Sequence, residues 1–114
     1  MTDRQKDIER LAEGVMGWHK SSPNGLTWLN TDGDVMRSVG FPFPWNPFES
    51  WHDAGMVWDE LAKQGYHRKL ACYHDGLCVA EIYKVKDIVF SGVEDIPPAA
   101  IAEAALRVLG TLDD

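Results

Sequence analysis

Three histidines in the middle of the sequence, His52, His67 and His74, are the first residues whose type suggests metal chemistry. A zinc site needs three or four converging ligands, for example two histidines four residues apart on one helix face. His67 and His74 are seven positions apart, so on a regular strand their side chains point to opposite faces. The spacing predicts ordinary surface or half-buried histidines, and neither a metal nor a cofactor is expected.

Cys72, His74 and Asp75 together suggest a nucleophile beside a base, the pairing that nucleophilic catalysis requires. A reactive cysteine also needs an electropositive, partly exposed setting that stabilises the thiolate. The residues around Cys72 are acidic and apolar instead. We therefore expect no catalytic residue here and a protein that is not an enzyme.

The two cysteines, Cys72 and Cys78, lie on either side of an expected tight turn. A disulfide between directly paired strand residues is strained, and the charged N-terminal segment does not have the pattern of a secretory signal. A reducing compartment, the cytoplasm, is the default for such a chain. These arguments predict two free, buried thiols.

Residues 41–45, Phe-Pro-Phe-Pro-Trp, differ in kind from the rest of the chain. Their prolines exclude a helix and a central strand. One interpretation is a lid that folds over the sheet; the other is a rigid aromatic binding surface, because rigid anchors lose little entropy on binding. The two agree if Phe43 packs inward while the later aromatic residues face outward. The predicted interaction surface is Phe41, Phe43, Trp45, Trp51 and His52.

The chain has 114 residues, a formal net charge of −7 and 45% hydrophobic residues. This length and composition predict one folded domain over residues 1–114. Basic residues are few and scattered, so direct nucleic-acid binding is not expected. No apolar run approaches the roughly 20 residues of a membrane-spanning helix, so no membrane association is expected. The acidic charge favours a basic partner.

Three segments carry helical signals. Residues 2–16 place apolar side chains at helical spacing, and Gly17 is the expected stop. Asn46, followed by a proline, is the expected N-cap of a second helix, which Gly65 ends. A third helix is expected after two prolines, over residues 99–110. Each helix therefore has at least one local boundary signal.

Strand signals lie between and after these helices. Residues 66–74 and 77–84 are expected to pair as a hairpin, because Asp75-Gly76 suits a type I′ turn with positive φ at both positions. Residues 87–91 are expected to continue the meander. Two short strands are expected at residues 26–29 and 35–39, after a loop at residues 19–25. This order predicts an α+β domain, a small antiparallel meander flanked by three helices.

Four sequence blocks in this order resemble the phage ABA-sandwich domain proteins, which are small products of phages and prophages. The resemblance spans about residues 8–110 and rests on Ala-Glu-Gly-Val-Met-Gly-Trp at residues 12–18, Asp-Ala-Gly-Met-Val-Trp at 53–58 with Glu-Leu-Ala-Lys at 60–63, Asp-Gly-Leu-Cys-Val-Ala-Glu-Ile-Tyr at 75–83 and the helix at 98–106. Where the family often has Ser or Thr before the helix aspartate, this chain has Trp51-His52. The resemblance implies an α/β/α sandwich and a phage origin, but no reaction.

These observations lead to the hypothesis of a phage or prophage accessory protein that works by binding in the host bacterial cytoplasm. Inhibition of a host protein, such as a defence-system component of the CRISPR type, is its concrete form, and a basic nucleic-acid channel is the surface that an acidic inhibitor would occupy. The alternatives are a domain that sequesters a nucleotide-like molecule by base stacking on Trp45 or Trp51, and a structural or virion-associated protein. A homodimer that forms through the aromatic loop is a further alternative.

Overall fold

The computed structural model describes residues 3–20, 28–29, 35–36, 45–85 and 88–113. Within them lie three helices, α1 (Asp3–Gly14), α2 (Trp51–Lys63) and α3 (Pro97–Asp113), and six strands, β1 (His19–Lys20), β2 (Trp28–Leu29), β3 (Val35–Met36), β4 (His67–Cys72), β5 (Cys78–Tyr83) and β6 (Phe90–Glu94). None of the described helices combines the length and the apolar character that crossing a membrane requires.

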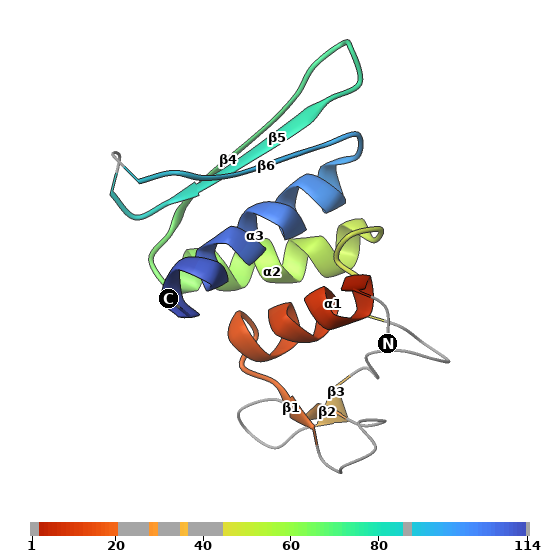
Figure 1. The fold of residues 1–114 in the computed structure, drawn as a ribbon, viewed down its shortest axis with the longest axis vertical. Helices are drawn as coiled ribbons and strands as arrows, with labels where there is room; N and C mark the ends of the chain where they lie inside the picture. The colour runs from red at the N-terminus through yellow and green to blue at the C-terminus, as the bar shows by residue number, and fades with distance from the viewer. Residues whose placement is uncertain (1–2, 21–27, 30–34, 37–44, 86–87, 114) are drawn as a thin grey trace.

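The strands form two antiparallel meanders, β1–β2–β3 and β4–β5–β6. Figure 1 shows the three helices between them, with the β4–β5–β6 sheet on one side and the short strands next to the end of α1. The predicted α+β class, with three helices and an antiparallel meander, is confirmed. The α/β/α sandwich that the family resemblance implies would place helices on both faces of a sheet. In this structure the described helices all lie on one side of β4–β5–β6.

Helix α2 begins at Trp51, four residues after Pro47, the predicted first residue, and it ends just before Gly65, as the sequence predicts. Its N-cap is Ser50, whose side chain accepts a hydrogen bond from the backbone N–H of Asp53. The predicted cap, Asn46, instead forms a separate turn, because its side-chain oxygen accepts from the N–H of Phe48, only two residues on. Gly65 ends the helix with φ of 95°, a conformation that a residue without a Cβ adopts at little cost.

The hairpin between β4 and β5 lies where Asp75-Gly76 predicts it, but its turn is of another type. Gly76 has a positive φ and Asp75 does not, which excludes type I′. The Gly76 N–H donates to the Tyr73 carbonyl, and the Tyr73 N–H donates to the Leu77 carbonyl. This is the pattern of a three-residue loop, a type I turn followed by a left-handed glycine.

Two strand predictions need correction. The third strand of the meander starts at Phe90, three residues later than predicted, because a turn closes first, with the Ile88 N–H donating to the Val85 carbonyl. Residues 19–20, predicted as loop, form β1 and pair with β2. A two-residue strand has no periodicity of its own, so only its partner strand reveals it.

The cysteines also depart from prediction. Cys72 and Cys78 oppose each other in the β4–β5 register, with Cα atoms 4.0 Å apart, and a disulfide joins them. No free cysteine is present in the described part of the chain. The expectation of two free thiols is therefore wrong, because direct pairing across the hairpin holds the two sulfur atoms within bonding reach.

Helix α3 packs on β5 and β6 through small side chains. Its buried positions include Ala100, Ala102, Ala104 and Ala105, and it lies so close to β6 that a Cβ atom on Gly92 would collide with the Ala100 carbonyl oxygen. The same atom would lie 2.6 Å from the Ala104 nitrogen. Because both neighbours are backbone atoms, rotating a side chain cannot relieve this contact.

We therefore expect Gly92→Ala to lower the free energy of unfolding by about 1–3 kcal/mol through overpacking. Gly55→Ala is the matched control, since Gly55 lies inside α2 with no atom within 4 Å of its added Cβ. That control should raise stability by up to about 1 kcal/mol, because alanine favours a helix interior over glycine. Urea denaturation of both variants checks this, and equal effects would contradict the packing argument.

Candidate functional site

The predicted aromatic surface does not lie on one face. Phe41 and Phe43 are outside the described residues. Trp45, predicted to face outward, is fully buried, and its ring lies 4.9 Å from that of Trp18. This prediction is wrong for Trp45 because its large ring gains more from burial against Trp18 than from exposure. Trp51, at 59% exposure, and His52 do face solvent at the start of α2.

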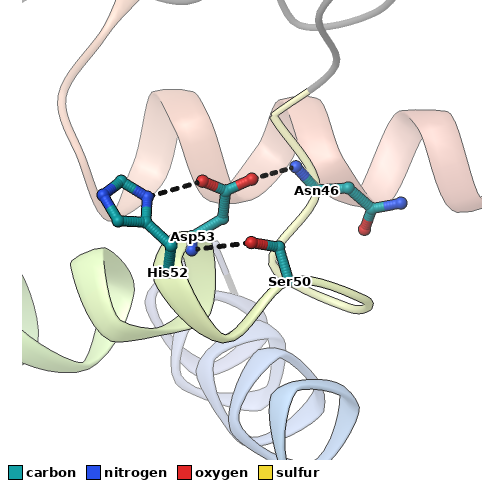
Figure 2. A network of polar contacts seen from close by, with 4 residues as sticks. All are labelled: Asn46, Ser50, His52 and Asp53. Carbon is teal, nitrogen blue, oxygen red and sulfur yellow. Dashed lines mark hydrogen bonds and ion pairs between the residues drawn. The ribbon is translucent and has the colours of Figure 1, made fainter.

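A polar network anchors the start of α2 (Figure 2). The Asp53 carboxylate is buried and accepts a hydrogen bond of 2.9 Å from the backbone N–H of Asn46. Its other oxygen lies 3.2 Å from Nδ1 of His52, and Ser50 accepts from the Asp53 N–H. The carboxylate thus ties the segment before α2 to the first turn of the helix, where negative charge is also favoured.

This network has the composition of a helix cap and not of a catalytic centre. Its carboxylate serves backbone N–H groups, and the His52 ring is 69% exposed. Across the described residues, no three His, Cys, Asp or Glu side chains lie close enough to bind a metal ion together. We therefore assign the network to positioning α2 and the turn that carries Trp45.

The β4–β5–β6 sheet has a second face that no described element covers. On the helix side, Cys78, Ala80 and Ile82 of β5 are buried. Side chains alternate along a strand, so the residues between them point the other way. With their partners in the register, these residues define what we term the open face: His67, Lys69, Ala71, Val79, Glu81, Tyr83, Ser91 and Val93.

Four of the eight residues of the open face are apolar or aromatic: Ala71, Val79, Tyr83 and Val93. Val93 is 51% exposed, and Ala71 and Val79 lie beside it in the same cross-strand row. The rings of His67 and Tyr83 stack with centroids 5.4 Å apart. Of the eight large hydrophobic side chains that are exposed in the described part of the chain, six belong to the sheet and its connections: Tyr73, Leu77, Val85, Ile88, Val89 and Val93. Most of the exposed apolar side chains therefore belong to this part of the molecule, which makes the open face the candidate site.

Charge on the open face is balanced, whereas the hairpin end is acidic. Lys69 and Glu81 are directly opposite in the register, so their charges offset each other. Asp75, in the hairpin turn, and Asp95, just after β6, are both exposed at the end of the sheet where β5 begins. A ligand on this face would therefore meet the Lys69–Glu81 pair in the middle, apolar or aromatic contacts on either side of it, and negative charge at the hairpin end.

The sequence contains a pattern that points to this face, although its periodicity alone does not show which side of the strand is exposed. Apolar residues occur at both parities of residues 77–83, with Cys78, Ala80 and Ile82 at one and Leu77, Val79 and Tyr83 at the other. A strand that is apolar on both sides is typical of one covered on both faces. Only the structure shows that one of the two coverings is missing from the described chain.

A pocket lies between α1 and the end of α3, and it is a candidate site for a small molecule. Arg10, Glu13, Gly14 and Leu109 line it, and its volume is about 210 Å³. Pockets for small molecules usually measure roughly 300–1,000 Å³. This one is therefore small for a nucleotide-sized ligand, and Trp45, one of the two tryptophans proposed for base stacking, is buried elsewhere.

No family model and no curated protein matches the sequence. Among solved structures, the chain is similar to a phage protein from Bacillus cereus ATCC 14579, with a TM-score of 0.67 and 14% sequence identity. The match covers 100% of this chain and 91% of that chain. At this identity the likeness shows a shared fold, and the resemblance to the phage ABA-sandwich proteins continues to rest on the sequence blocks.

Removal of the buried carboxylate should destabilise the protein. Asp53→Ala leaves the Asn46 N–H without this acceptor, and we expect a loss of about 1–3 kcal/mol in the free energy of unfolding. Asp59→Ala in the same helix is the control, because Asp59 is 77% exposed and reaches Arg68 only at 3.4 Å. It should change stability by no more than about 0.5 kcal/mol. Equal losses in urea denaturation would contradict the anchoring role of Asp53.

Proposed function

We propose that this protein is a phage accessory protein that acts by binding a host protein through the open face. The observation that carries the proposal is the uncovered sheet face with Val79, Val93 and the His67–Tyr83 ring pair on it. Patches of this kind on small proteins are typical of protein–protein contacts. The fold shared with a phage protein from Bacillus cereus supports the phage context.

The host target that we propose has a basic surface. The formal net charge of −7 gives the protein a negative field, which accelerates encounter with a positively charged partner and disfavours nucleic acid. Inhibition would follow if the bound protein occupies a basic channel of the target, as in a nucleic-acid-binding component of a defence system. Binding alone suffices for this action, so the proposal includes no chemical step.

The open face is a better candidate for this contact than the aromatic stretch at residues 41–52. Trp45 contributes to the core, so of the predicted site residues that the structure describes in that stretch, Trp51 and His52 are exposed. They stand on one helical turn, whereas the open face extends over three paired strands. A protein interface needs an area of about 800 Å² on each partner, which favours the larger surface.

The two surfaces can be separated by mutation. Tyr73 and Leu77 pair across the hairpin at the same parity as the outward residues of β4 and β5, so they extend the open face to the hairpin end. The double variant Tyr73→Ser/Leu77→Ser removes these two exposed apolar side chains, and Trp51→Ser removes the exposed ring on α2. With tagged protein as bait in a host bacterial lysate, we expect the double variant to recover at least about tenfold less partner, as loss of interface anchors does. Trp51→Ser should recover the same amount as the unmodified protein.

A cellular measurement accompanies the recovery assay. Expression in bacteria that carry an active defence system should raise the plating efficiency of a targeted phage, and the double variant should fail to do so. The proposal is wrong if the unmodified protein neither recovers a partner nor changes plating efficiency. A partner that Trp51→Ser loses and the double variant keeps would move the site to α2.

A further inference from the structure

We infer that the open face binds one amphipathic α-helix of the partner, with an apolar stripe over the sheet and basic residues at the end that meets Asp75 and Asp95. This inference rests on the proposed function and specifies the chemistry of the partner at the same site. Three features of the described residues carry it: the two-sided apolar character of β5, the width of the sheet and the charge at its hairpin end.

The central strand carries apolar side chains on both faces, with Glu81 as its one charged residue, on the outer face. Ala80 and Ile82 are fully buried under the helices, while Val79 and Tyr83, on the opposite face, remain partly exposed. A sheet with one face in water usually alternates apolar and polar residues, whereas a sheet covered on both faces is apolar at both parities. The missing layer is the one that a partner would supply.

The dimensions of the sheet suit a single helix. Three strands at about 4.8 Å spacing make a face roughly 10 Å wide, which matches the diameter of one helix with its side chains. On the other face, helix α3 covers β5 and β6 in this way, and α2 lies against β4 (Figure 1). The six residues of β5 extend about 20 Å, a length that about 14 helical residues span.

Charge decides between a foreign helix and a second copy of this chain. A second copy would bring the same net charge of −7 to the interface, so the two molecules would repel each other. A basic helix would instead place lysine or arginine near Asp75 and Asp95, which are exposed at the hairpin end. The central Lys69–Glu81 pair adds no net charge that would oppose it.

A synthetic helical peptide tests the inference without knowledge of the natural partner. The probe has about 16 residues, with leucines at positions i, i+3, i+4 and i+7 for the apolar stripe and lysines beside it. A matched peptide carries glutamate at every lysine position. Fluorescence anisotropy with the labelled peptides should show saturable binding of the lysine peptide, at least tenfold tighter than that of the glutamate peptide, and a smaller difference at high salt.

Variants of the full chain locate the binding. Val93→Lys places a charge in the apolar row of the open face nearest the hairpin end, at a half-exposed position on an edge strand that tolerates lysine. It should weaken binding of the lysine peptide at least tenfold, whereas Trp51→Lys, which adds the same charge at an exposed apolar residue on α2, should leave affinity unchanged. Leu77→Lys, in the hairpin connection, gives an independent second variant, and thermal unfolding confirms that each variant is folded.

Equal binding of the two peptides, no saturable binding, or unchanged affinity in both Val93→Lys and Leu77→Lys would overturn the inference. A dimer mass in light scattering that Val93→Lys converts to a monomer would assign the open face to a second copy. If a cellular partner is recovered through the hairpin end while the lysine peptide does not bind, only the helix inference fails. If the peptide binds and no cellular partner exists, the proposed function fails instead.

Discussion

The arrangement of the molecule depends on the close contact between α3 and Gly92 of β6. A glycine at this position lets the backbone of the helix approach the backbone of the strand, and Ala100 and Ala104 keep the helix side of the contact equally small. The helix therefore lies flat on the sheet and covers one face of it. Because the described helices lie on the same side, this contact also decides which face remains open.

The second helix depends on a set of short polar contacts. Ser50 and the buried Asp53 satisfy backbone N–H groups at its start, and Gly65 provides the left-handed residue at its end. The Asp53 carboxylate binds the N–H of Asn46, the residue next to Trp45, which in turn packs on Trp18. The polar contacts of Asp53 and the packing of Trp45 on Trp18 thus stabilise the same segment. Both are structural, so the candidate binding surface is on the sheet.

Local signals made much of the fold predictable. Gly17 and Gly76 have the positive φ values expected of a helix stop and a hairpin. The third helix, predicted over residues 99–110, includes the paired prolines and continues past Gly110, from Pro97 to Asp113. Each signal acts within a few residues, so the sequence contains all of the physics that determines it. The choice between Asn46 and Ser50 as the cap of α2 was mispredicted although its contacts are also short-range, because Asn46 closes its own turn and its N–H donates to Asp53, seven residues on.

The sequence by itself determined that this is an acidic α+β domain with an Asp-Gly hairpin and three helices, each with at least one local boundary signal. The tertiary structure decided the rest: that Trp45 is buried against a tryptophan 27 positions earlier in the chain, that Cys72 and Cys78 are bonded, and that the odd-numbered residues of β5 face outward. Alternation shows that two faces exist, but it cannot show which of them a helix will cover. That choice depends on how a helix packs against the strands, as in the close approach of α3 to Gly92.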